Sequence, residues 1–306
     1  MIHFLSIHWD VNPELFSIGV FRIGYYNILF VLGFITGHYI VRGFFRRELL
    51  PVKLVENLTY TVFFSAAIGA RLGHCLFYNP VYYLSHPIEI LKIWEGGLAS
   101  HGGALGILIG VWLFIRKYGR KYGFGYIWLL DRCVIPTALA GCFIRLGNLM
   151  NSEIYGVGTS LPWGFIFARR GETMPMHPTQ IYEALSYLLI FFFLMWLYNK
   201  CLPRLKTGMF LGLFFILVFT ARFLIEFIKN TQVSFEQKMA LDMGQWLSIP
   251  FILFGIGLLI YSYTQGKPAM LPLQTQVVLH PAPKPKPVHA NMVHKDGNRL
   301  GKKKRG

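Results

Sequence analysis

Long apolar runs, separated by short polar connections, are the dominant pattern of this chain. A helix needs about 20 apolar residues to cross the hydrocarbon core of a bilayer, and about seven runs approach that length. The pattern therefore predicts an all-α, multi-pass membrane protein. The predicted spans are roughly 19–41, 54–77, 97–115, 125–144, 179–199, 208–228 and 244–263.

Basic residues gather in alternate connections, which indicates an orientation. By the positive-inside rule these connections face the cytoplasm. The N-terminus, with Asp10 and Glu14, is then predicted outside and the C-terminus inside. The basic residues follow the first, third, fifth and seventh spans: Arg42, Arg46, Arg47, Lys53, Arg116, Lys117, Arg120, Lys121, Lys200, Arg204, Lys206 and Lys267.

Composition supports lipid as the solvent. The 306 residues are 54% hydrophobic and only 14% charged, against roughly 25% charged in soluble domains. The net charge of +16 lies in the connections and the C-terminal part, so it indicates topology and anionic lipid rather than nucleic acid. The first residues lack a basic segment followed by an apolar core, so no cleaved signal peptide is expected. The four cysteines form no CxxC pair and are expected to be inert.

Two regions are predicted from this pattern. Residues 1–264 form the transmembrane domain, and residues 265–306 form a Pro- and Lys-rich tail containing PAPKPKP and GKKKRG. With few apolar residues to bury, the tail is expected to be disordered and cytoplasmic. A solvated charge run and attraction to anionic headgroups both explain it.

Ionisable side chains inside the spans are the best candidates for function, because a buried charge in a membrane needs a partner or a cavity. By the predicted topology all of them except Asp131 lie toward the outer leaflet, so they could converge on one outward-facing cavity. They are Arg71, His101, Asp131, Arg145, Arg222 and Glu226.

Two of these positions point to an anionic ligand. Arg222 and Glu226 are spaced i, i+4 and can pair, either as a structural ion pair or as an arginine held ready for an anion. Arg145 opens a polar segment that continues through Asn148, Asn151 and Glu153. Arginine suits phosphate because its planar guanidinium donates two parallel hydrogen bonds and stays charged.

Two histidines and a tyrosine complete the candidates. His101 lies among glycines, including Gly102, and its ordinary pKa near 6.5 would suit a base for a thiol. His177 begins the segment HPTQIYE, where it could cap a helix, orient Glu183 or contact a lipid headgroup. Tyr26 begins the first span. Structural roles, such as a satisfied histidine or an interfacial tyrosine, would also explain all three.

At these residues the chain resembles the bacterial prolipoprotein diacylglyceryl transferase family, over roughly residues 10–263. The family signature is approximately G-R-x-G-N-F-x-N-x-E-x-x-G, and the chain has IRLGNLMNSEIYG at 144–156. Arginine, both asparagines and the glutamate are kept, and the signature ends at Gly156. The segments EGGLASHGG, GARLGHCLFYN, HPTQIYE and ARFLIEF also match, Tyr26 falls at a functional tyrosine, and Asp131 at an acidic position. Val218 stands where well-known members have a tyrosine.

The resemblance implies a transferase that moves the diacylglyceryl group of phosphatidylglycerol to the lipobox cysteine of a prolipoprotein, releasing glycerol 1-phosphate. The expected partners are this lipid, the prolipoprotein signal peptide and the bilayer. No cofactor or metal is expected. The expected location is the bacterial inner membrane, with the site toward the periplasm.

The resemblance also implies roles for the candidate residues. His101 would be the general base, and Arg145 and Arg222 would hold the phosphate. The residues expected to bind substrate or to orient the arginines are Tyr26, Arg71, Gly102, Asn148, Asn151, Glu153, Gly156, His177 and Glu226.

Other classes of membrane protein predict different patterns. A transporter or channel would place polar residues through the whole membrane depth and show repeats, but here they gather near one face. An intramembrane protease would need a Ser/His pair, paired aspartates or HExxH, none of which stands out. A purely structural scaffold would leave the arginines unexplained.

Overall fold

The structure, a computed structural model, describes residues 6–18, 21–92, 96–230 and 240–271. A short helix α3 (Pro80–Ser85) and the 3-10 turns η1 (Pro87–Leu91), η3 (Ala168–Arg170) and η4 (Leu202–Arg204) lie in connections. Within these ranges, long helices make up most of the chain: α1 (Tyr25–Arg47), α2 (Lys53–Tyr78), α4 (Ser100–Tyr122), α5 (Tyr126–Met150), α6 (Thr179–Cys201), α7 (Met209–Glu226) and α8 (Met243–Gln265).

The long helices confirm the prediction of a helical multi-pass membrane protein. Five of them, α1, α5, α6, α7 and α8, have both the length and the apolar composition of a membrane span. Helices α2 and α4 are 26 and 23 residues long, which is long enough to cross. They are less uniformly apolar, so the count of seven spans stays a prediction.

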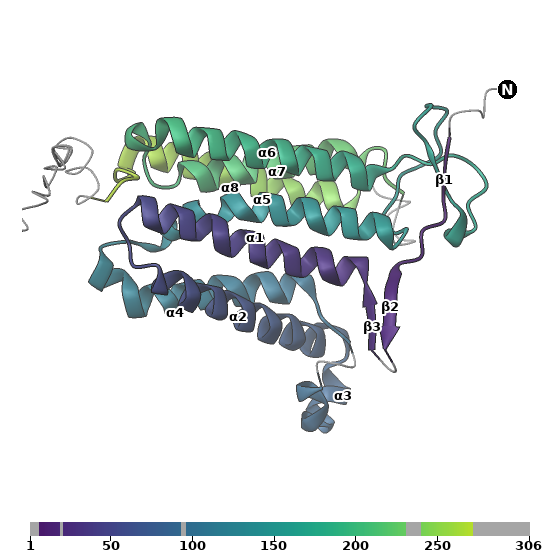
Figure 1. Ribbon diagram of the computed structural model, residues 1–306, viewed down its shortest axis with the longest axis horizontal. Coiled ribbons are helices and arrows are strands. Elements are labelled where there is room, and N and C mark those ends of the chain that lie inside the picture. Colours follow the sequence, from purple (N-terminus) through teal and green to yellow (C-terminus); the bar gives the residue numbers. More distant parts are fainter. Residues whose placement is uncertain (1–5, 19–20, 93–95, 231–239, 272–306) are drawn as a thin grey trace, which may run out of the picture.

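The long helices lie side by side in one bundle (Figure 1). Helix α1 packs on α5, α2 on α4, α5 on α6, and α7 on α8. The N-terminal strands lie at one end of the bundle, called here the strand end, and residues 266–271 lie at the other, called the tail end. This separation fits an odd number of spans, and which end faces the cytoplasm stays a prediction.

Helices α2 and α4 approach each other through glycines. A Cβ on Gly69 would lie 2.4 Å from the carbonyl oxygen of Gly102, and one on Gly106 would lie 2.2 Å from that of Ser65. Small residues at fourfold spacing allow helix backbones to approach closely in a membrane, where packing and polar contacts replace the hydrophobic effect as the driving force. The glycines therefore join this helix pair.

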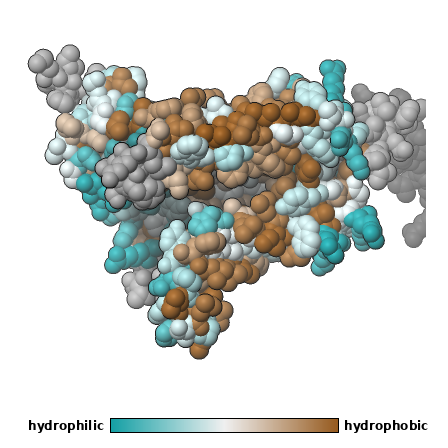
Figure 2. Space-filling view, turned by 180° about the vertical axis from the view of Figure 1, so that it is seen from behind, coloured by the Kyte–Doolittle hydropathy of each residue, from teal (hydrophilic) through white to brown (hydrophobic). Residues whose placement is uncertain are grey.

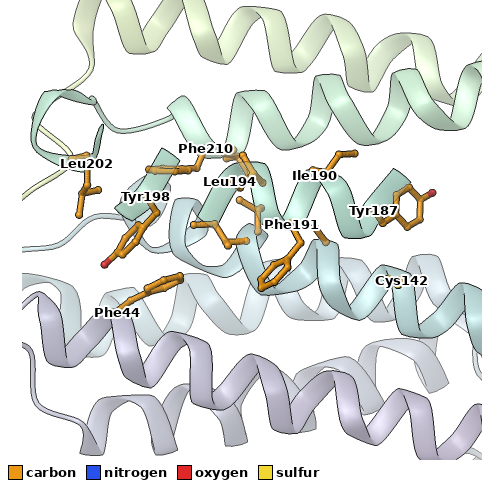
Figure 3. Close-up of a cluster of buried hydrophobic side chains, with 14 of the residues drawn as sticks. Phe44, Cys142, Tyr187, Ile190, Phe191, Leu194, Tyr198, Leu202 and Phe210 are labelled. Atoms are coloured by element: carbon orange, nitrogen blue, oxygen red, sulfur yellow. The ribbon is translucent and has the colours of Figure 1, made fainter. Parts of the chain in front are cut away.

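Aromatic and aliphatic side chains fill the space between α1, α5, α6 and α7 (Figure 3). The ring of Phe44 packs at a tilt against that of Tyr198, with centroids 4.1 Å apart, and Leu194 is fully buried. Tyr187 lies at the opposite end of the row from Tyr198, with its hydroxyl pointing away from the other labelled side chains.

Large apolar side chains cover the outside of the bundle, as a lipid-facing surface requires. Figure 2 shows long apolar tracts along the helices, with hydrophilic side chains gathered mainly at the two ends. Each of five helices presents side chains more than half exposed, for example Val31, Phe64, Leu113, Leu189 and Leu253.

Short strands close the strand end, in addition to the predicted helices. Strands β2 (Glu14–Ile18) and β3 (Phe21–Gly24) form an antiparallel hairpin before α1. Strand β1 (Ile7–Trp9) pairs in parallel with β4 (Phe165–Phe167), which lies in the α5–α6 connection. Together they hold the N-terminal segment against that connection.

Asp131 has a structural role at the tail end. It is fully buried, and its Oδ2 and Oδ1 accept hydrogen bonds from the backbone N–H groups of Gly208 (2.7 Å) and Leu211 (2.8 Å). These groups lie at the start of α7, where the N–H groups have no partner within the helix. The carboxylate thus caps α7 from a neighbouring helix.

Arg132, which the sequence analysis did not single out, forms a second buried polar group at the tail end. Its guanidinium lies 3.1 Å from Glu48 and donates to the carbonyl oxygen of Ala269 at 2.7 Å. Tyr198 also donates to Glu48, and Ala269 is fully buried. Residues 266–271, which the sequence assigned to the tail, therefore pack against the bundle, and 272–306 lie outside the described residues.

The cap on α7 predicts a specific loss of stability. We expect Asp131→Ala to lower the free energy of unfolding by about 1–3 kcal/mol, because two buried N–H groups lose their acceptor. Thermal unfolding in detergent, followed by circular dichroism, measures this. Thr137→Ala, at an exposed position on the same helix, is the control, and equal melting of the two variants would contradict the assignment.

Candidate functional site

The signature segment 144–156 covers the last turns of α5 and the loop after it, at the strand end. Ser152 and Ile154 adopt left-handed backbone conformations, with φ of 51° and 62°, which are costly for non-glycine residues and persist only where the surroundings enforce them. Here side chains from outside the loop hold its carbonyl oxygens: Trp9 donates to Leu149 (3.1 Å), Arg170 to Ser152 (2.8 Å) and Gln180 to Glu153 (2.7 Å).

A continuous polar chain runs through this segment. Nε of Arg145 lies 2.8 Å from Oε2 of Glu183 on α6, and its Nη1 donates to Oδ1 of Asn148 at 3.3 Å. Asn148 and Asn151 both donate to Oε1 of Glu153, at 2.8 and 3.2 Å. The structure thus joins all the polar residues of the predicted signature. The ion pair with Glu183 and the hydrogen bond to Asn148 fix the direction of the arginine.

Tyr26 lies against the same group. A Cβ on Gly147 would lie 2.7 Å from the Tyr26 ring, so the glycine makes room for the tyrosine. The hydroxyl lies within electrostatic range of Glu153 and Arg145. Tyr26 begins α1, so the first helix contributes to the site as the sequence predicted.

Lys229, in the turn after α7, joins two glutamates. Its Nζ lies 3.2 Å from Glu183 and 3.2 Å from Glu226. The lysine and both carboxylates are buried. Glu226 is also in close contact with Gly244 of α8, where a Cβ would lie 2.4 Å from the carboxylate. Three elements, α6, α7 and α8, therefore meet at this pair of carboxylates.

Tyr187 brings the two predicted arginines together. Its hydroxyl lies close to Arg145 and within electrostatic range of Arg222 and Glu183. Arg222 forms no ion pair with Glu226 within 4 Å among the described residues, and its buried Nε has no hydrogen-bond partner. The expected i, i+4 pair is thus replaced by the Lys229–Glu226 pair.

These side chains form one group of compensating charges, with three cations and three carboxylates from α5, α6, α7 and the adjoining loops. We call it the charge cluster: Arg145, Glu153, Glu183, Arg222, Glu226 and Lys229.

Arg71 lies apart from the charge cluster and organises a loop. It is buried, and its guanidinium donates to the carbonyl oxygens of Ile90 (2.9 Å), Gly96 (2.6 Å), Gly97 (3.3 Å) and also Glu89. Most of the N–H donors of Arg71 are therefore occupied by carbonyl oxygens of the α2–α4 connection. Trp94 and Glu95, which come directly before Gly96, lie outside the described residues.

His101 begins α4 at the strand end and is exposed. Its ring lies 5.4 Å from that of Phe77 and 6.2 Å from that of Tyr78, both at the end of α2. No hydrogen bond to its imidazole is found in the part of the chain that the structure describes. Gly102 packs against Gly69, so its place in the structure is a helix–helix contact.

Gly156 and His177 are paired through their backbones. The N–H of Gly156 donates to the carbonyl oxygen of His177 (2.8 Å), and a Cβ on Gly156 would lie 2.2 Å from the carbonyl oxygen of Ile228. His177 Nδ1 lies 3.2 Å from the hydroxyl of Tyr182, and burial lowers the pKa of His177. A lowered pKa favours the neutral ring, which can accept from this hydroxyl.

Sequence reasoning missed three residues of the site. Glu183 was considered only beside His177, and Lys229 and Tyr187 were not considered. The signals were present in HPTQIYE and ARFLIEFIKN, where Glu183 follows a predicted membrane interface and Lys229 lies one turn beyond Glu226. The choice of ion-pair partner for each of these side chains depends on contacts between helices that are distant in the sequence. The spacing of residues along one helix does not predict those contacts.

Comparisons with known proteins agree on one family. The family described as prolipoprotein diacylglyceryl transferase matches residues 13–261. A phosphatidylglycerol–prolipoprotein diacylglyceryl transferase of Tolumonas auensis is 46% identical over 256 residues, covering 84% of this chain and 97% of the relative. Proteins with the same name from Porphyromonas gingivalis and Chloroherpeton thalassium are 47% and 45% identical, covering 83% and 85% of this chain and 94% and 96% of theirs.

The Arg71 contacts predict a local effect. We expect Arg71→Lys to speed backbone hydrogen exchange at 96–99 by about tenfold or more, since a lysine cannot donate along several directions at once. Hydrogen exchange with mass spectrometry measures this. Segment 152–156, held by other side chains, is the internal reference, and unchanged exchange at 96–99 would contradict the role.

Proposed function

The chain belongs to the prolipoprotein diacylglyceryl transferase family, and we propose that it transfers the diacylglyceryl group of phosphatidylglycerol to the lipobox cysteine of a prolipoprotein. In this reaction the cysteine sulfur attacks the glycerol carbon that carries the phosphate. A C–S bond forms, the C–O bond to the phosphate breaks, and glycerol 1-phosphate leaves with the bonding electrons. The observation that carries the proposal is the meeting of Arg145 and Arg222 at Tyr187.

The leaving phosphate needs positive charge in a site of low dielectric. Arg145 is suited to this because Glu183 and Asn148 fix its guanidinium. Arg222 is suited because its buried Nε has no hydrogen-bond partner among the described residues, so an entering phosphate would satisfy this donor. We assign both arginines to the phosphate, with Glu153 and Glu226 as the carboxylates that balance the site.

His101 is assigned as the base that takes the thiol proton, because thiolate is the nucleophile in such a reaction. Its exposure at the start of α4 leaves the imidazole accessible. It lies on the α2–α4 pair, whereas the arginines lie on α5 and α7. Between these parts the space-filling view shows a hollowed surface (Figure 2), which would suit a lipid that enters from the membrane.

The remaining predicted residues receive two kinds of role. Tyr26, Asn148 and Asn151 lie beside Arg145 and are assigned to headgroup or ester oxygens. Arg71 and Gly102 are assigned to shaping the site, through the loop and the helix contact described above. Gly156 and His177 are also assigned to shaping the site, at the start of α6.

The orientation proposed places the strand end in the periplasm and the tail end in the cytoplasm of the bacterial inner membrane. Basic residues in the last turns of α1, α4 and α6 support this: Arg46, Arg47, Arg120, Lys121 and Lys200. All three turns lie at the tail end, as the positive-inside rule requires of a cytoplasmic face.

Mass spectrometry of a lipobox peptide incubated with the purified protein and phosphatidylglycerol tests the function. The expected product is a diacylglyceryl thioether on the cysteine. Ion or solute flux in vesicles without peptide modification would instead favour a transporter. A peptide with serine in place of the lipobox cysteine is the control, because it lacks the thiol.

We expect Arg145→Lys to lower kcat/KM on the order of 100-fold, because a lysine keeps the charge but loses the bidentate geometry that meets the developing phosphate charge. The transfer assay with purified protein measures this. Arg47→Lys, at the tail end of α1, makes the same chemical change away from the site and is the control. Near-normal turnover of Arg145→Lys would exclude bidentate phosphate binding.

For the base, we expect His101→Ala to lower kcat about 100-fold or more with little change in KM, because general base catalysis acts in the transition state. The loss should shrink as pH rises, since more of the substrate thiol is then already ionised. His38→Ala, within α1, is the control. Full transfer at pH 7 would remove His101 from this role.

A further inference from the structure

The charge cluster contains a cation that the proposed reaction does not use. Lys229 is buried and lies 3.2 Å from both Glu183 and Glu226. We infer that Lys229 is a positioning residue that keeps Arg222 available to the lipid phosphate, by occupying the carboxylate that would otherwise hold this arginine. The inference rests on the proposed function.

Glu226 has two possible partners on its own segment. Arg222 precedes it by four residues and Lys229 follows it by three, and both spacings allow contact on a helix. In the structure the lysine makes the contact, and no other described residue provides a hydrogen-bond partner for the buried Nε of Arg222. An unpartnered buried donor is costly, so Arg222 would turn to Glu226 if the lysine were absent.

The position of Lys229 is set by backbone contacts. Lys229 forms an antiparallel bridge with Gly156, and the N–H of Val157 donates to the carbonyl oxygen of Ile228 at 2.9 Å. A side chain on Gly156 would collide with that oxygen. The end of the signature loop therefore places the ammonium group between the two glutamates.

The carboxylate of Glu226 is held from the other side as well. Gly244 at the start of α8 lies so close that an added Cβ would be 2.4 Å from it. Glu183 meanwhile has a second cation, Arg145, at 2.8 Å. Loss of Lys229 would thus leave Glu183 paired and Glu226 unpaired, so the effect would pass to Arg222 rather than to Arg145.

The charge count supports the same conclusion. With Lys229, the charge cluster has three cations and three carboxylates, and one cation can turn to an incoming anion while the carboxylates stay paired. Without it, two arginines face three carboxylates. A site with excess negative charge repels a phosphate, because unpaired charges in low dielectric interact strongly.

A double-mutant cycle tests this. Lys229→Met should lower kcat/KM for phosphatidylglycerol on the order of 100-fold, mainly through KM, while Lys229→Arg should stay close to wild type. Adding Glu226→Gln to Lys229→Met should recover activity about tenfold, since the freed Arg222 is available again. Lys200→Met, at an exposed site at the tail end of α6, is the matched control.

Native mass spectrometry of phosphatidylglycerol retained by the same variants gives a readout that needs no turnover. Retention should fall in Lys229→Met and return in the double variant. The inference is overturned if Lys229→Met behaves as wild type, or if the double variant is no better than Lys229→Met in retention and transfer. A wild-type protein that retains the lipid in this pattern but transfers nothing would instead contradict the proposed function.

Discussion

Compensation of charge inside a lipid-facing bundle is the constraint on which the strand end depends. An isolated ion buried in a membrane protein is expensive, so each arginine there needs carboxylates and each carboxylate needs a cation. Glu183 shows how tightly this is arranged, because it contacts both Arg145 and Lys229. These ion pairs fix α5, α6 and the turn after α7 relative to one another.

The same rule is met differently at the tail end. There the buried charges also have backbone partners: Asp131 accepts from the start of α7, and Arg132, besides its ion pair with Glu48, donates to Ala269 after α8. These contacts give hydrogen-bond partners to the N–H groups at the start of α7 and to the carbonyl oxygen of Ala269, which would otherwise be unpaired in an apolar environment. The tail end is therefore stabilising in character, whereas the strand end keeps an arginine donor, the Nε of Arg222, that has no partner within the described ranges.

The division between the helix groups suits a reaction on a lipid. Helices α2 and α4 join through glycines, while α5, α6, α7 and the adjoining loops carry the charge cluster. His101 lies on the first group and both arginines on the second. A thiol and a phospholipid headgroup, which come from different substrates, could thus be met by residues from different parts of the bundle.

The sequence was enough to predict the helical membrane architecture, the approximate bounds of the long helices and the family, because apolar runs and local motifs are properties of contiguous residues. It also predicted that Arg145, Asn148 and Glu153 lie close together, since they fall within two turns and a short loop. It did not determine the short strands at the strand end, whose pairing joins β1 to the distant β4. It also did not show that Asp131 caps another helix.

The ion pairs, by contrast, depend on the tertiary structure. Glu226 follows Arg222 by four residues and precedes Lys229 by three, and either spacing allows a pair. The choice follows from the bridge between Lys229 and Gly156 and from Glu183 on α6, which are contacts across the fold. When several charged residues have similar spacing from a carboxylate, tertiary packing selects which of them pairs with it. That packing involves elements from the whole chain.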